Sequence, residues 1–333
     1  MNPDENVRSD PVAVRQDGAG AAATAADLPL VAVLMAVCNG ERFLAQQIRS
    51  ISLQKSVRVD LWVSDDGSRD ASTDIVRRVA ETWRLGRVRL VEGPQRGFAE
   101  NFRSLLVRAE INADYYAFCD QDDVWDDDKL AHAVSWLKTQ ASDRPALYCS
   151  RTRIISADGE TVGQSPLFPR APSFRNALVQ SIAGGNTMVM NRAARELLLE
   201  ASRRTGFVSH DWWCYMLVSG AGGNVFYCPE PRIAYRQHED NLVGQNNTWR
   251  ARMSRIGFLL RGRFRNWTDV NLAGLEVCRD LLTDDARVAL NHFEDARKRR
   301  FPGCLRSLRR SGVYRQTVFG ELGLYAACAI GRL

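Results

Sequence analysis

Short apolar runs alternate with stretches of helical periodicity over the first part of the chain. Four runs have the length and apolar content of buried β-strands, at 30–36, 59–64, 88–91 and 115–119. The segment after the first run places Leu44, Ile48 and Ile51 at helical spacing, and similar segments follow the second and third runs. Alternation of strands and helices is typical of an α/β protein with a doubly wound, mostly parallel sheet.

Polar clusters follow three of these predicted strands directly. They are CNGE at 38–41, DDGSRD at 65–70 and DQDDVW at 120–125. In doubly wound sheets, ligands bind beyond the carboxyl ends of the strands, so we expect the three clusters to line one ligand site. Asp128 is expected to cap the helix after the fourth strand, and Ser68 or Asp70 the helix after the second.

The middle of the chain carries three further motifs. Asp158 and Gly159 form the Asp-Gly pair typical of a β-hairpin. GGN at 184–186 indicates a tight loop, and HDWW at 210–213 is predicted to open a helix. YRQHEDN follows at 235–241 and contains His238.

Composition narrows the class of protein. The chain has 333 residues, of which 45% are hydrophobic and 25% charged, enough for one large domain or one domain with an appendage. The net charge of +6 is too small to indicate nucleic-acid binding, and we expect no nucleic-acid partner. The eight cysteines are scattered without a CxxC pair, which favours a reducing, cytoplasmic setting over a disulfide framework or a zinc cluster.

The two ends differ from the middle. Residues 1–27 are rich in Ala and Gly and begin with acidic residues, so they are predicted to form a disordered tail and not a signal peptide. We expect a catalytic domain over 28–245 and a helical, arginine-rich region over 246–333. Six arginines and no acid lie between Trp249 and Trp267. No apolar run reaches the ~18 residues of a membrane-spanning helix.

The basic C-terminal region has two interpretations. From Arg297 to Arg315 there are eight basic residues and no acid, followed by an apolar segment. One interpretation is peripheral attachment to anionic lipids at the inner face of the plasma membrane. The residues expected to insert are Val318, Phe319, Leu322, Leu324 and Tyr325. The other interpretation is a basic helix packed on the catalytic domain.

The acidic motifs suggest metal-assisted chemistry. Asp120 and Asp122 are two residues apart at a strand end, so both carboxylates can face one hard cation such as Mg²⁺ or Mn²⁺. Such a cation stabilises charge on a departing diphosphate. Asp65 can accept from a base or ribose, although its motif also fits a turn and a helix cap. Asp211 is a candidate general base.

These motifs together resemble those of bacterial glycosyltransferase family 2, in particular its rhamnosyltransferase-type members that build O-antigen and other cell-surface polysaccharides. The motifs occur in the family's order over roughly 30–245: VLMAVCNGERFLAQQI, SDDGSRDAS, GFAENF, FCDQDDVW, GGNTMVMN, HDWW and YRQHEDNLVG. The resemblance implies a GT-A fold, which is Rossmann-like with a mostly parallel sheet. It also implies a nucleotide-sugar donor, a divalent metal and inversion at the anomeric carbon. Val37 and Cys38 depart from it, because Thr-Tyr often stands there.

The resemblance also assigns residues. Asp65 resembles the carboxylate that recognises the base, and Glu41 one near the nucleoside. The implied donor site comprises Ala36, Glu41, Asp65, Asp66, Arg96, Asp120 and Gln121. The implied metal ligands are Asp120, Asp122 and His238, and the implied acceptor site is Gly185, Asn186 and Trp212. Asp211 matches the catalytic base.

The partners expected are therefore dTDP-rhamnose, with a UDP-sugar next, and a glycan or lipid-linked acceptor; the base can still be thymine, uracil or guanine. A nucleotidyltransferase is the nearest rival, but CNGERF lacks the Gly-rich basic loop that cradles a triphosphate. A haloacid-dehalogenase-type phosphatase would place its acidic motif after the first strand. An inactive nucleotide-sugar-binding protein of the same fold is the rival from a different functional class.

Overall fold

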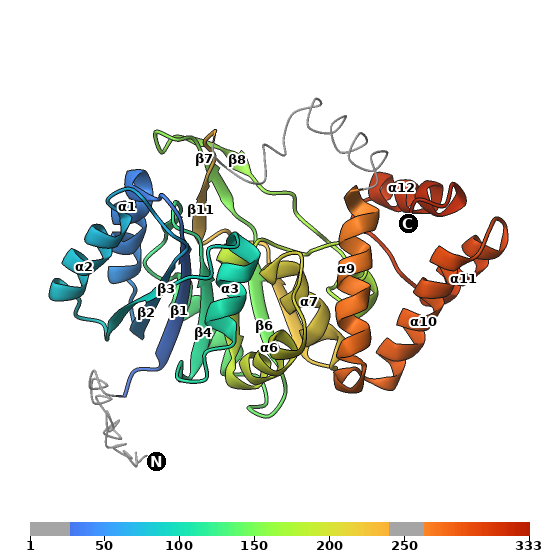
Figure 1. Cartoon of the computed structure of the whole chain (residues 1–333), viewed down its shortest axis with the longest axis horizontal. Helices are drawn as coiled ribbons and strands as arrows, with labels where there is room; N and C mark the ends of the chain where they lie inside the picture. Colours follow the sequence, from blue (N-terminus) through green and yellow to red (C-terminus); the bar gives the residue numbers. More distant parts are fainter. Residues whose placement is uncertain (1–26, 240–262) are drawn as a thin grey trace, which may run out of the picture.

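The computed structural model describes residues 27–239 and 263–333 (Figure 1). The predicted tail lies outside these residues except for Asp27, and so does most of the arginine-rich segment between Trp249 and Trp267.

A seven-stranded sheet forms the centre of the molecule, in the order β10-β6-β9-β4-β1-β2-β3. Its strands are β1 (Leu30–Val37), β2 (Arg58–Asp65), β3 (Val88–Glu92), β4 (Tyr115–Cys119), β6 (Ala146–Ser150), β9 (Val189–Asn191) and β10 (Asn224–Cys228). The four predicted strands are present as β1 to β4, and all four are parallel. β9 alone runs antiparallel to its neighbours β4 and β6. The predicted mostly parallel α/β fold is therefore confirmed.

Helices cover both faces of this sheet, because side chains alternate between the faces along each strand. Val31, Val33 and Met35 of β1 pack with helices α1 (Glu41–Ser52), α2 (Ser72–Thr82) and α4 (Lys129–Leu137). Ala32 and Leu34 pack on the opposite face. The helices there are α3 (Phe98–Leu106), α5 (Phe174–Ala177), α6 (Arg192–Arg204) and α7 (His210–Gly220).

A second, four-stranded sheet has the order β5-β11-β7-β8. Its strands are β5 (Val124–Trp125), β7 (Arg153–Ile155), β8 (Thr161–Gln164) and β11 (Ile233–Arg236). The predicted hairpin is β7–β8, and Gly159 takes a φ of +91° in its turn, which glycine adopts without strain. Because β5 follows the DQDD motif and pairs with β11, this sheet brings His238 beside that motif.

The C-terminal region is helical, as predicted. It contains α9 (Arg263–Val277), α10 (Asp284–Lys298), α11 (Gly303–Ser311) and α12 (Val318–Ala329), together with the short 3-10 helix η2 (Arg279–Leu281) (Figure 1). Leu290, Phe293, Leu308 and Leu324 belong to the same apolar cluster as the side chains of α7. The basic helices thus pack on the sheet domain.

Two local predictions are wrong. Leu324, expected to insert into a membrane surface, is 3% exposed and packs in that internal cluster. Asp128 precedes α4, but its side chain makes no cap hydrogen bond and instead pairs with Arg232.

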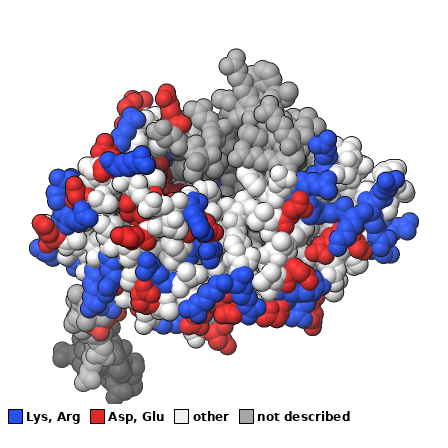
Figure 2. All heavy atoms as spheres, viewed as in Figure 1, with Lys and Arg blue, Asp and Glu red and all other residues white. Residues whose placement is uncertain are grey.

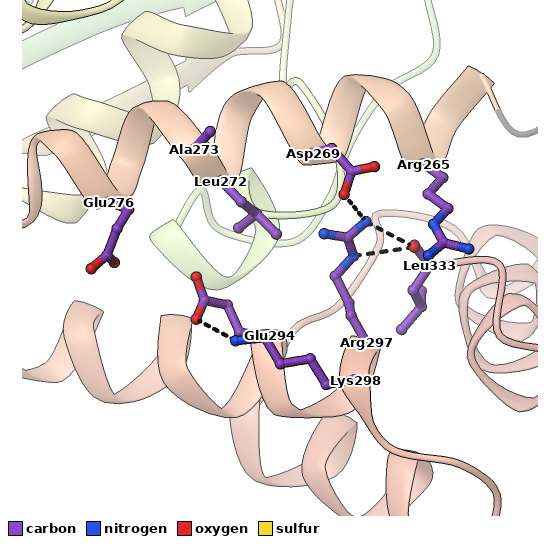
Figure 3. Close-up of a pocket in the computed structure, with 9 residues that line it drawn as sticks. All are labelled: Arg265, Asp269, Leu272, Ala273, Glu276, Glu294, Arg297, Lys298 and Leu333. Carbon is purple, nitrogen blue, oxygen red and sulfur yellow. Dashed lines mark hydrogen bonds and ion pairs between the residues drawn. The ribbon is translucent and has the colours of Figure 1, made fainter.

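Figure 3 shows how Leu333 contacts the C-terminal helices α9 and α10. The guanidinium of Arg297 donates to Asp269 Oδ1 at 2.6 Å and to the main-chain oxygen of Leu333 at 3.0 Å. No helix in the described part of the chain has both the length and the apolarity to cross a lipid bilayer.

Candidate active site

Three loops meet at one edge of the central sheet. Val37 lies opposite Asp65 in the β1–β2 register, and Met35 lies opposite Cys119 in the β1–β4 register. The CNGE, DDGSRD and DQDD clusters therefore follow neighbouring strand ends, as the sequence predicts.

The carboxylates of the first two loops have different surroundings. Asp65 Oδ2 accepts from the Ser68 amide at 3.1 Å, whereas its Oδ1 has no hydrogen-bond partner among the described residues. Asp66 accepts from the amides of Gln95 and Gly97 at 2.6 and 2.8 Å, so it holds the loop between β3 and α3. Asp65 therefore keeps one oxygen without a partner among the described residues, whereas each oxygen of Asp66 already accepts a hydrogen bond.

Other predicted donor-site residues lie around these carboxylates. Glu41 accepts from the Ala71 amide at 2.9 Å, linking α1 to the start of α2. Arg96 is exposed at the tip of the loop that Asp66 holds, and Ala36 lies in β1. Ala71 holds the N-cap position of α2 and offers no side-chain cap, so neither Ser68 nor Asp70 stands at that position. Asp70 nevertheless accepts from the amide of Ser72, the first residue of α2, at 3.0 Å.

Gln121 connects two loops. Its Oε1 accepts from the Cys38 amide at 2.8 Å, and its Nε2 donates to the Cys38 carbonyl at 3.2 Å. A Cβ atom at Gly40 would lie 2.6 Å from Gln121 Oε1, so only glycine leaves room for this bridge. The predicted contact of Gln121 with the donor would have to share these atoms with the main chain.

Asp122 and His238, two of the predicted metal ligands, lie in direct contact. His238 Nε2 lies 2.8 Å from Asp122 Oδ2, and the His238 ring lies against Phe43. Burial, and then the negative charges of Asp122 and Asp211, raises the pKa of Asp120 to about 7. Asp122 and Asp211 therefore both lie close enough to Asp120 to disfavour its negative charge.

The donor atoms fit part of a divalent cation's coordination shell. Adjacent ligand atoms around an octahedral ion with ~2.1 Å bonds are ~3 Å apart, which is close to the Asp122–His238 spacing. Mg²⁺ usually takes its remaining ligands from waters and substrate phosphates. No group of three or more His, Cys, Asp or Glu side chains is arranged around a metal position within residues 27–239 and 263–333.

Asp211 lies in the first turn of α7, as predicted, and accepts from Ser181 Oγ at 3.4 Å. Of the predicted acceptor-site residues, Trp212 donates to the Ala177 carbonyl at 2.6 Å and is 7% exposed. Gly185 and Asn186 are buried in the 3-10 helix η1 (Gly185–Thr187). All three residues are buried, and their contact with an acceptor stays a prediction.

The sequence reasoning overlooked two residues that hold the acidic loop. Arg236, 2% exposed, donates to the Asp122 carbonyl at 3.0 Å, to the Ala157 carbonyl at 2.8 Å and to Gln46 Oε1 at 2.8 Å. Asp123 is fully buried and accepts from the Arg236 amide at 3.2 Å. Asp123 was identifiable as the third acid of DQDD; nothing in the pattern marked Arg236.

The sequence profile of glycosyl transferase family 2 matches residues 32–198, and the chain belongs to this family. It is 27% identical over 247 residues to dTDP-rhamnosyl transferase RfbG of Shigella flexneri, covering 69% of this chain and 81% of the relative. It is 26% identical to the putative teichuronic acid biosynthesis glycosyltransferase TuaG of Bacillus subtilis, covering 67% and 84%. The structure resembles S. aureus TarS 1–349 in complex with UDP, with a TM-score of 0.51 and 15% identity, covering 91% of this chain and 88% of TarS. The protein is therefore a family 2 glycosyltransferase with a GT-A fold.

Proposed function

We propose that this glycosyltransferase moves a sugar, with rhamnose favoured, from a nucleotide-diphosphate donor to a growing cell-surface glycan or lipid-linked acceptor. The observation that carries the proposal is the proximity of two different chemical groups. The Asp122–His238 pair offers ligands for a cation, and Asp211 lies near enough to affect the charge of Asp120. The name of the Shigella relative supports dTDP-rhamnose as the donor, with a UDP-sugar as the next candidate.

Asp120, Asp122 and His238 would hold Mg²⁺ or Mn²⁺. The ion would supply positive charge for the departing nucleotide diphosphate. Arg236 fixes the main chain of Asp122, and Gln121 fixes the same loop against Cys38, so the carboxylates are oriented before a donor binds.

Asp211 would accept the proton of the attacking acceptor hydroxyl. The Ser181 hydroxyl donates to one oxygen of its carboxylate, and the other oxygen would face the acceptor. A single base and a single displacement imply inversion at the anomeric carbon. Proton NMR of the product would show retention if a glycosyl-enzyme intermediate were formed.

We also propose that the protein binds peripherally at the cytoplasmic face of the membrane. Val318, Phe319 and Leu322 of α12 are 76%, 88% and 63% exposed. Exposed arginines of α11 lie nearby, and Figure 2 shows uncharged surface at this end of the molecule beside lysine and arginine side chains. A helix with this exposed apolar face can enter the headgroup region while the arginines bind anionic lipids.

The test separates donor binding from chemistry. Asp122→Asn should weaken Mn²⁺-dependent binding of nucleotide diphosphate, whereas Asp211→Asn should bind it normally and lose roughly 10²–10⁴-fold in turnover. Calorimetric titration of dTDP, UDP and GDP, each with Mn²⁺, measures binding and also identifies the nucleobase of the donor. Asp127→Asn is the matched control, because Asp127 lies just after β5, in the segment that follows the DQDD motif, and pairs with Lys55 at the surface. Equal loss of nucleotide affinity in the Asp211 and Asp122 variants would refute the assignment of Asp211 as the base, as would turnover at the parent rate in Asp211→Asn.

A further inference from the structure

The turn over residues 184–187 lies between the DQDD motif, which contains Asp122, and the candidate base Asp211. It precedes β9, which runs antiparallel to β4, so the start of β9 lies beside the end of β4. The Phe118 amide donates to the Met188 carbonyl at 3.3 Å at this point. The turn therefore lies next to the DQDD motif, and on its other side it contacts the first residue of α7.

Asp123 holds the turn on the side of the metal ligands. Asn186 Nδ2 donates to Asp123 Oδ2 at 2.6 Å, while Asp123 Oδ1 accepts from the Arg236 amide at 3.2 Å. Asp123 is 0% exposed and Asn186 is 3% exposed, so water does not reach this pair. Both carboxylate oxygens are needed, because each one faces a different N–H donor.

His210 holds the turn on the side of the base. A Cβ atom built on Gly185 would lie 1.9 Å from His210 Nε2, so the imidazole ring occupies the space that any side chain at 185 would need. The ring is stacked on Phe102 with a centroid distance of 3.7 Å and meets Phe118 edge-on at 4.7 Å. Its position is therefore fixed by the turn and by two aromatic rings.

We propose that Asp123 and His210 are positioning residues, which act through the turn at 184–187 to set the separation between Asp122 and Asp211. Asp123 immediately follows Asp122, and His210 immediately precedes Asp211. A shift of the turn therefore moves one chemical group relative to the other. The inference rests on the proposed roles of Asp122 and Asp211 in transfer.

Exchanging the two side chains provides a direct test. In Asp123→Asn the single oxygen can serve either Asn186 or the Arg236 amide, and the other donor loses its partner. In Asn186→Asp two carboxylates face each other in a buried site. The double variant D123N/N186D reverses the hydrogen bond: the amide now at position 123 donates to the carboxylate now at position 186, and its oxygen still accepts from the Arg236 amide. The net charge of the double variant equals that of the parent.

Turnover is measured as dTDP released from dTDP-rhamnose with Mn²⁺ when water takes the rhamnosyl group in place of the acceptor hydroxyl, and dTDP–Mn²⁺ affinity is measured by calorimetry. We expect each single variant to lose at least ~10-fold in kcat with nucleotide affinity within about 3-fold of the parent, and the double variant to regain a kcat within about 3-fold. Hydrogen exchange of amides at 183–188 and 209–213 should rise in both single variants and return to the parent rate in the double variant.

The control is Asn191→Asp at the other end of β9. Asn191 is also buried and donates to the Arg144 carbonyl at 2.8 Å, so this change removes a comparable hydrogen bond away from the turn. It should lower thermal stability without lowering kcat per folded molecule.

Single variants with parent kcat and parent exchange rates would overturn the proposal. So would a folded double variant without turnover, because the reversed bond should restore the turn. If the parent does not use dTDP-rhamnose, the proposed donor is wrong. The hydrogen-exchange rates at 209–213 then decide the question. Raised rates in the single variants that return to the parent rate in the double variant support coupling of the turn to α7, and unchanged rates in the single variants contradict it.

Discussion

Gly185→Ala should lower both stability and kcat, because the added methyl group would clash with the His210 ring, which is packed against other side chains on its far side. Its Cβ would lie 1.9 Å from His210 Nε2, and tolerable contacts begin near 3.4 Å, so the ring or the turn must move by about 1.5 Å. Phe102 and Phe118 close the space behind the ring. Overpacking of this kind costs ~1–3 kcal/mol, and we expect the upper end of that range.

A loss of about 3 kcal/mol should lower Tm by roughly 4–5 °C, because the unfolding entropy of a chain of this length is about 0.7 kcal/mol/K. Because Asp211 follows His210, kcat should fall by at least ~10-fold even at temperatures where the variant is folded. Scanning calorimetry and turnover per folded molecule give the two values. Gly323→Ala is the control, since a Cβ there meets no atom within 4 Å and alanine favours a helix.

A double-mutant cycle with His210→Ala tests the cause. If the methyl group and the ring collide, removing the ring should relieve part of the Gly185→Ala cost, and the two effects should deviate from additivity by at least ~1 kcal/mol. Additive losses would refute the reasoning, as would a Gly185→Ala variant that melts at the parent temperature.

Three further changes probe other parts of the molecule. Burial lowers the pKa of His210 to about 4, so the stability that the neutral ring contributes is present above pH 6.5 and is lost as the pH falls toward 4. Over this range, the free energy of unfolding measured in urea should fall by up to ~3 kcal/mol more in the parent than in His210→Phe. Equal falls in the two proteins would contradict this. Phe319→Ser with Leu322→Ser should shift the protein from the pellet to the supernatant with phosphatidylglycerol liposomes at low salt, whereas an unchanged distribution would remove α12 from membrane binding. Excess EDTA should abolish transfer and Mn²⁺ should restore it, and full activity in EDTA would exclude the metal role of Asp122 and His238.

The sequence predicted four of the seven strands of the central sheet, because strand and helix periodicities are local. Tyr115–Cys119 is the predicted fourth strand, and the other three extend by only a residue or two. The strand-end rule then placed the acidic motifs together, since parallel strands bring their carboxyl ends to one edge. These inferences need no knowledge of distant contacts.

What the sequence did not predict depends on distant contacts. No local pattern reports that the oxygens of Asp66 accept from the amides of Gln95 and Gly97. Leu324 lies in an apolar run that suits a membrane surface, but tertiary packing buries it. Asn186 is committed to Asp123, 63 residues earlier in the chain, and no periodic pattern reports such a pairing.

The order of synthesis matters for this site. Asp122 depends on Arg236, 114 residues later, for a fixed main chain and on His238, 116 residues later, for its ring contact. A ribosome-bound chain that ends before β11 therefore contains the candidate base Asp211 and the DQDD motif, but it lacks the strand that fixes the main chain of Asp122. We expect such nascent chains to bind nucleotide weakly and to leave donor sugars intact, so that competence appears only when the second sheet closes.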